Sequence, residues 1–150
     1  MNYPKIDFSK FEPFSELVFD TTLASDPNKT DDLSRFVVTF YHHEFTGDQL
    51  LESEANYQNL INVAIQSGNL KGLETLWKGI YYHDRNNPDF ESDFYTALEC
   101  ANLETIQHVH NAYKNYATLQ PFEPIDSNKA KELAKNNSNT GVFDYISTIF

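Results

Sequence analysis

A stretch of fourteen residues occurs twice in this chain, thirty-three positions apart. Residues 64–77 (AIQSGNLKGLETLW) align with residues 97–110 (ALECANLETIQHVH), and the alignment places Asn69 on Asn102. A fixed period of this length is typical of stacked helical units. Each such unit has an apolar face that only a neighbouring unit can cover. We therefore expect an all-α chain built from repeated helix pairs.

The spacing of apolar residues supports helix pairs along most of the chain. The first thirteen residues contain two prolines and no helical period, so we expect an extended arm there, with Tyr3, Phe8 and Phe11 packing over the first helix. The remainder, residues 14–150, is expected to form one domain of about four pairs. The predicted helices cover residues 14–24, 31–40, 53–67, 70–77, 92–100, 103–116, 127–135 and 141–149.

Turn and cap residues mark the boundaries of these helices. Gly68 stands where a left-handed residue usually ends a helix, and Asn69 can cap the next one. Asp31 or Asp32 can cap the second predicted helix, and Gly47 interrupts the pattern at residues 44–48. Ser138-Asn139 occupies the place in the last pair that Gly68-Asn69 and Ala101-Asn102 occupy in the middle pairs.

The charge balance excludes some partners. The 150 residues carry 22 acidic and 11 basic side chains, giving a formal charge of −11. Phosphate contacts need Lys and Arg, so direct binding to nucleic acid or to an anionic membrane is disfavoured. The single cysteine, Cys100, fits a reducing compartment. Without a signal peptide or an apolar run of about 18 residues, the sequence predicts a soluble cytoplasmic protein.

The repeated segment is similar to the ankyrin-repeat family. Residues 64–77 follow the middle of that family's unit, in which a helix containing alanine is followed by a turn at glycine, then Asn, Leu and an apolar stretch. Residues 97–110 follow the same pattern, with Ala101 in place of the glycine. The resemblance implies a short solenoid of about four stacked helix-turn-helix repeats. It leaves open whether the connectors form hairpin fingers or plain loops. It also implies binding to other proteins, as bacterial or viral members do when they target host factors.

No pattern of catalytic or metal-ligating residues emerges. His42-His43 and the pair His108 and His110 have spacings that place their rings on different helix faces, and Cys100 lacks a companion at zinc-ligand spacing. Residues 26–37 begin like a calcium loop but have Val37 where a bidentate Glu is needed. We therefore expect no catalytic site, no cofactor and no metal. A hydrolase or transferase with an unrecognised site is therefore a weaker hypothesis than the two binding functions described below.

Two groups of aromatic and basic side chains are the candidates for contact with a partner. Large amphipathic rings and arginine are enriched at binding hot spots. Burial between helix layers is the competing interpretation, and for Trp77 it is the favoured one. The first group consists of Trp77, at the end of the predicted helix 70–77, and of Tyr81, Tyr82, His83, Asp84 and Arg85 in the connector that follows this helix. The second group consists of Tyr41 and His42, after the second predicted helix.

The leading hypothesis is a non-enzymatic protein-protein interaction module with a rigid surface for a protein partner, which its acidity predicts to be basic. If it is a secreted effector, its location would be the host cytosol. The alternative is an acidic inhibitor that imitates nucleic acid and blocks a nucleic-acid-binding protein. That alternative requires carboxylates in rows at phosphate-like spacing, and strong salt sensitivity would distinguish it.

Overall fold

The computed structural model describes residues 6–84, 88–117 and 124–150, and these residues are mainly helical. Eight α-helices and three shorter helical turns occur in the described residues, and no β-strand occurs among them. The prediction of an all-α chain is therefore confirmed. The chain divides into two compact units, unit 1 (Met1–Pro88) and unit 2 (Asp89–Phe150). The single repeat domain expected over residues 14–150 stays a prediction.

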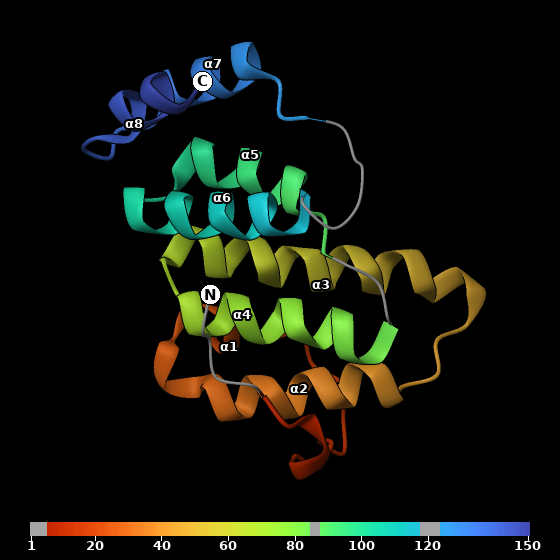
Figure 1. Cartoon of the computed structure of the whole chain (residues 1–150). Coiled ribbons are helices and arrows are strands. Elements are labelled where there is room, and N and C mark those ends of the chain that lie inside the picture. Colours follow the sequence, from red (N-terminus) through yellow and green to blue (C-terminus); the bar gives the residue numbers. More distant parts are fainter. Residues whose placement is uncertain (1–5, 85–87, 118–123) are drawn as a thin grey trace. The chain divides into compact units, whose positions relative to one another are not determined.

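Unit 1 consists of three long helices, one short helix and three short turns (Figure 1). Helix α4 packs against α2 and α3, and α1 contacts α2, α3 and α4. The elements in chain order are η1 (Phe8–Lys10), α1 (Thr22–Ser25), η2 (Pro27–Lys29), α2 (Thr30–His42), α3 (Gly47–Ser67), α4 (Leu70–Gly79) and the π-helical turn η3 (Ile80–Asp84), which continues α4.

Helices α3 and α4 form a hairpin with a two-residue connection. Gly68 ends α3 at φ 68°, a left-handed conformation that a residue with a Cβ adopts at a cost. The Asn69 side chain then accepts the backbone N–H of Gly72 at 3.1 Å and begins α4. Leu73 and Leu76 point inward from α4 and are fully buried. Both turn predictions, the left-handed Gly68 and the Asn69 cap, are confirmed.

Replacing Gly68 tests this turn. Gly68→Ala is expected to lower the free energy of unfolding by about 1–2 kcal/mol, because a Cβ clashes with its own backbone at positive φ. Gly68→Asn should lose less, since asparagine tolerates the left-handed region. Urea unfolding followed by the fluorescence of Trp77 measures both changes. Equal losses for the two variants would contradict the role of the turn.

The segment before α2 differs from the prediction. The prediction of a helix over residues 14–24 is wrong, because only Thr22–Ser25 is α-helical in this segment. Side-chain contacts with α2 hold this segment in a non-helical path. The backbone N–H of Phe14 donates to Thr39 Oγ1 at 2.7 Å, and the Arg35 guanidinium lies 4.0 Å from the centre of the Phe14 ring. The ring of Phe19 lies edge-on to Phe36 at 5.4 Å.

The expected extended arm over residues 1–13 contains a helical turn. Residues 1–5, which include Tyr3, lie outside the described residues. Asp7 caps η1, and Phe8 within this turn is buried. Its ring packs against Tyr82 and His83, both at 5.4 Å, and not over a first helix. The arm is thus fixed to the end of η3.

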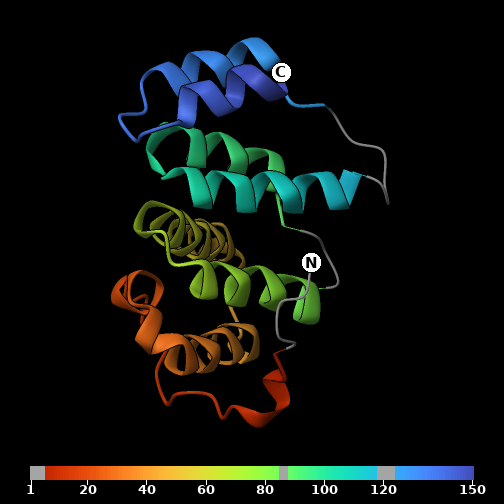
Figure 2. The same ribbon diagram turned by 60° about the vertical axis from the view of Figure 1, so that its left-hand side comes forward.

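Unit 2 contains two helical hairpins. Helix α5 packs against α6 and α7, and α8 packs against α6 and α7 (Figure 2). Phe94, Leu98, Ile106 and Ile146 are fully buried and come from α5, α6 and α8. The elements are α5 (Phe90–Cys100), α6 (Leu103–Ala117), α7 (Ser127–Lys135) and α8 (Val142–Ile149), which agree closely with the predicted helices.

The connections in unit 2 match the repeat in part. Asn102 Oδ1 accepts the backbone N–H of Thr105 at 2.9 Å and so caps α6 as Asn69 caps α4. Ala101 differs from Gly68 because its φ is −88°, an ordinary value for alanine. Asn139, at the corresponding place in the last pair, does not cap α8. Gly141 occupies the N-cap position of α8, and six residues separate α7 from α8.

The inter-helix turns also donate hydrogen bonds to the preceding helix pair of the same unit. In unit 1, Asn69 Nδ2 donates to the carbonyl of Ala24 at 2.8 Å. In unit 2, Asn137 Nδ2 and Asn139 Nδ2 donate to the carbonyl of Ala101 at 2.9 and 3.0 Å. Asparagine side chains therefore connect successive helix pairs in both units. None of the helices in the described ranges has the length and apolarity needed to cross a membrane.

Candidate functional site

Two of the predicted partner-contact residues meet in unit 1. The rings of Tyr41, at the end of α2, and His83, in η3, stack face to face with centroids 4.5 Å apart and planes only 2° from parallel. The Tyr41 hydroxyl donates to Asp84 Oδ2 at 3.3 Å. His83 Nδ1–H donates to the carbonyl of Gly79 at 3.1 Å, which fixes the orientation of the imidazole. Side chains 42 residues apart are thus brought into one cluster.

Two tyrosines extend this cluster into solvent. Tyr82 lies edge-on to His83 at 4.8 Å, and its ring also lies 5.4 Å from that of Phe8. Tyr81 is 64% exposed and Tyr82 is 50% exposed, which is unusual for such large rings. We call Tyr41, Tyr81, Tyr82 and His83 the aromatic patch.

Three other candidates do not join the aromatic patch. Trp77 is 4% exposed, so the side chain is part of the interior, as the competing interpretation proposed. His42 is exposed, and its Nδ1–H donates to the carbonyl of Val38 at 2.9 Å, within its own helix. Arg85 lies outside the described residues.

Close packing between α2, α3 and α4 supports the aromatic patch. The buried hydroxyl of Tyr57 donates to the carbonyl of Leu76 at 2.6 Å and so joins α3 to α4. Gly79 leaves room for this contact, because a Cβ there would lie 2.5 Å from a Val37 methyl and 2.8 Å from the Tyr57 hydroxyl. Only glycine permits this approach, and the last turn of α4 can therefore lie directly against α2 and α3.

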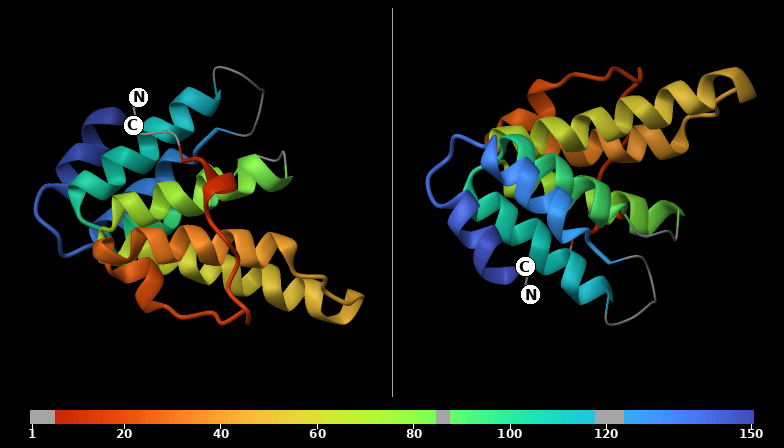
Figure 3. Two further views of the ribbon diagram at one scale, coloured as in Figure 1. Left: turned by 90° about the horizontal axis from the view of Figure 1, so that it is seen from below. Right: turned by 90° about the horizontal axis from the view of Figure 1, so that it is seen from above.

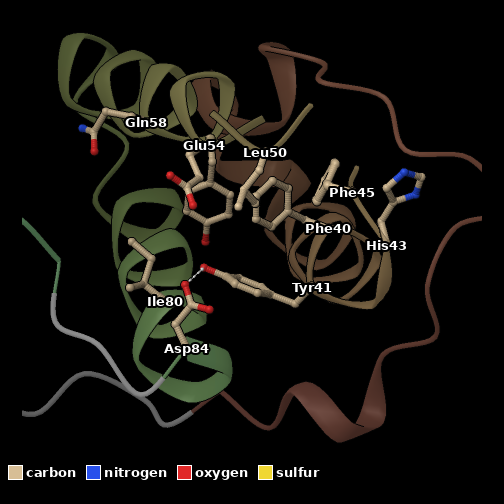
Figure 4. A pocket seen from close by; sticks show the side chains of 10 residues that line it. Phe40, Tyr41, His43, Phe45, Leu50, Glu54, Gln58, Ile80 and Asp84 are labelled. Atoms are coloured by element: carbon tan, nitrogen blue, oxygen red, sulfur yellow. Dashed lines mark hydrogen bonds between the residues drawn. The ribbon is translucent and has the colours of Figure 1, made fainter. Parts of the chain in front are cut away.

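A pocket of about 350 Å³ opens beside the aromatic patch. It lies between the end of α2, the first half of α3 and η3. Figure 4 shows Tyr41 extending from α2 toward Asp84, with Glu54 descending from α3 over the same opening. Four aromatic rings and two carboxylates dominate the wall. The lining residues are Phe40, Tyr41, His43, Phe45, Leu50, Glu54, Tyr57, Gln58, Ile80 and Asp84.

Burial sets the protonation states around the pocket. Burial, and then the charge of Asp84, raise the pKa of the Tyr41 hydroxyl well above its usual value, so it stays a donor at neutral pH. Burial likewise raises the pKa of Tyr57. Burial lowers the pKa of His83, although the hydrogen bond to Gly79 opposes that shift. The hydroxyls of Tyr41 and Tyr57 therefore keep their protons at neutral pH.

The first half of α3 was not predicted as part of the site. Helix α3 begins at Gly47 and not near residue 53, and its first turns extend past the other helices of unit 1 (Figure 3). Residues 46–49, Thr-Gly-Asp-Gln, match the capping box, and Gln49 Oε1 accepts the backbone N–H of Thr46 at 3.3 Å. This local signal could have located the helix start and placed the pocket-lining residue Leu50 in the helix.

The remaining chemistry-bearing residues do not form a second site. Among the described residues, no group of three His, Cys, Asp or Glu side chains lies together as metal ligands would. The thiol of Cys100 donates to the carbonyl of Thr96, and burial raises its pKa, which disfavours a reactive thiolate. His110 is enclosed by aromatic rings in unit 2.

The comparisons with known proteins found nothing similar to this chain. No family model, no curated protein and no solved structure matches it.

Proposed function

We propose that this chain is a non-enzymatic protein-protein interaction module, built as a short stack of ankyrin-like helix pairs, with the aromatic patch and the adjoining pocket as its contact surface. The observation that carries the proposal is the exposure of Tyr81 and Tyr82 next to an open pocket walled by rings. Tyrosine gives large contact area at small entropic cost and is common at binding hot spots. Leu50 and Leu51, 45% and 78% exposed, add apolar surface from the start of α3.

The asparagine connections support the repeat part of the proposal. Asn69 and Asn102 both cap the second helix of a pair from equivalent positions of the repeat. The amide groups of Asn69 and Asn139 also donate to a backbone carbonyl of the pair that precedes them in their unit. A repeat stack needs such a contact at each layer, because each unit depends on its neighbour for stability.

The charge of the chain supports a basic partner in a reducing compartment such as the cytosol. A net charge of −11 steers a basic protein toward the surface and increases its association rate. With a single cysteine the chain forms no internal disulfide, so its fold does not need an oxidising compartment. Specificity would then come from the aromatic patch, whose contacts are short-ranged and much less sensitive to salt than charge steering is.

Replacing the two exposed tyrosines tests the proposed function. The Tyr81→Ser/Tyr82→Ser variant is expected to lose partner proteins that wild type retains in affinity capture, with at least about a thirtyfold loss of affinity for a hot spot. Phe143→Ser is the matched control, because Phe143 is an exposed ring in unit 2 (40% exposed).

Quantitative mass spectrometry of the captured proteins at low and high salt measures both variants. An unchanged protein set for the tyrosine variant would remove the aromatic patch as the contact surface. Loss of every captured protein at moderate salt, for all variants alike, would favour the acidic inhibitor that imitates nucleic acid.

A further inference from the structure

The pocket beside the aromatic patch combines two features that seldom occur together on a protein surface. Its wall contains the rings of Phe40, Tyr41, Phe45 and Tyr57, and it also contains the carboxylates of Glu54 and Asp84. None of its described lining residues is Lys or Arg. We propose that this pocket binds the guanidinium group of an arginine side chain presented by the protein partner. The proposal rests on the proposed function, and it specifies the chemistry of the contact.

The two carboxylates are available to a cationic ligand. Glu54 is exposed, and it makes no hydrogen bond or ion pair with any other residue in the described part of the chain. Asp84 is also exposed and accepts from Tyr41 through Oδ2 only, so Oδ1 remains open among the described atoms. A guanidinium group has five N–H donors in one plane and can donate to both carboxylates.

The aromatic rings are held in place before a ligand arrives. Tyr41 is fixed by its stack on His83 and by its hydrogen bond to Asp84. The ring of Phe40 lies 4.8 Å from Tyr57 and 5.3 Å from Phe45. A cation near aromatic faces is attracted by their electron density, and preorganised rings lose little entropy on binding. A planar guanidinium stacks on such faces better than an ammonium group does.

Two helix ends add to the negative potential at the pocket. Helix α2 ends at His42, and the π-helical turn η3 ends at Asp84, so both present carbonyl ends near the opening. The C-terminal end of a helix carries partial negative charge that favours a nearby cation. The pocket volume of about 350 Å³ lies within the usual range for small-ligand sites.

The test uses a defined probe. N-acetyl-arginine amide is titrated into the ¹⁵N-labelled full chain and followed by NMR. We expect chemical-shift changes at Tyr41, Phe45, Glu54 and Asp84 that saturate with the probe. N-acetyl-citrulline amide, which has the same shape without the charge, should bind at least tenfold more weakly. Lysine amide acetylated on its α-amino group, which keeps the charged ε-ammonium group, should bind about threefold more weakly than the arginine probe. A lysine probe that binds more tightly than arginine would overturn the choice of ligand.

Variants connect the binding to the carboxylates. Glu54→Gln and Asp84→Asn are each expected to weaken the arginine probe about three- to fivefold, the size of a partly exposed charge pair. Glu52→Gln is the matched control, because it removes the same charge from α3 two residues away, on another face of the helix. Equal weakening by Glu52→Gln, or equal binding of arginine and citrulline probes, would overturn the proposal. If one of these outcomes overturns the arginine proposal while Tyr81→Ser/Tyr82→Ser still loses its captured proteins, the proposed function stands without the arginine contact.

Discussion

Asn69→Ala is expected to lower the free energy of unfolding of unit 1 by about 3 kcal/mol. The side chain is 4% exposed and makes two contacts that alanine cannot replace. It accepts the N–H of Gly72 as the cap of α4, and loss of a cap costs about 1 kcal/mol. It also donates to the carbonyl of Ala24, and a buried carbonyl left without its donor costs about 1–3 kcal/mol. Urea unfolding monitored by Trp77 measures the change.

Two further variants separate the contributions of Asn69. Asn69→Ser keeps an oxygen that can cap α4 but removes the amide donor, so about 1–2 kcal/mol should be lost. Asn102→Ala, at the equivalent position of the repeat, should cost only about 1 kcal/mol, because the Asn102 side chain is exposed. Far-UV circular dichroism follows that variant, since Trp77 is the only tryptophan and lies in unit 1. Equal effects of Asn69→Ala and Asn102→Ala would contradict the contact with Ala24.

Acidification is expected to destabilise unit 2 through His110. This side chain is 8% exposed and lies against Phe94 and Phe150, with Nδ1 hydrogen-bonded to the hydroxyl of Tyr145 at 3.1 Å. Burial first, and then the positive charge of Lys114, lower its pKa from 6.5 to about 4.

The direction of the pH effect follows from the two pKa values of His110. Between pH 6.5 and pH 4 the unfolded chain binds a proton that the folded chain does not, so the stability of unit 2 falls as the pH falls. The loss is complete below about pH 4 and amounts to about 3 kcal/mol at most. His110→Gln removes this titration, so the stability difference between wild type and variant should change by about 3 kcal/mol between pH 6.5 and pH 4. A difference that stays constant with pH would show that His110 is not responsible.

An NMR titration of the His110 imidazole measures the folded-state pKa directly. A midpoint near 6.5 in the folded protein would show that the ring is solvated and would remove the predicted destabilisation. Thermal unfolding at several pH values, for wild type and His110→Gln, then relates the midpoint to stability.

The sequence predicted the features that short-range chemistry determines. The left-handed Gly68 and the cap at Asn69 depend on residues within one helical turn, and the structure confirms both. Asn102, which the repeat aligns with Asn69, caps α6 in the same way. The helices of unit 2 were predicted because each has an apolar face of regular spacing. Helix termini and turns of this kind can be located without knowledge of distant contacts.

Features that depend on distant contacts were missed. The apolar spacing of residues 14–24 resembles one helix, but Phe14 and Phe19 each pack on α2 from a non-helical segment. The contact with Arg35 and Thr39 outweighs the local preference, and no local pattern reveals it. Periodicity located the connection before α8 to within one residue, but it gave no indication that Asn137 in this connection is buried and donates to the carbonyls of Leu98 and Ala101.

The candidate site shows the same division. Tyr41, Tyr82 and His83 were chosen individually for their side-chain chemistry, and their side chains do lie together in unit 1. The stack of Tyr41 on His83 and the pocket beside it depend on how α2 and η3 pack, which the sequence alone does not specify. Leu50 was missed as a pocket residue because the predicted start of α3 excluded the turns before residue 53. Glu54 lies inside the predicted helix, but no local pattern connects it with the pocket.

The two-residue connection at Gly68-Asn69 has a consequence for how this protein can change over evolutionary time. An insertion there would displace the asparagine from both its cap and its contact with Ala24, so that end of unit 1 tolerates no change in length. At the opposite end of unit 1, four residues connect α2 to α3, and none of the hydrogen bonds described for these residues reaches another helix pair. New loop residues can therefore be acquired around the pocket without disturbing the layers, and related chains could exchange one ligand for another while keeping the same scaffold.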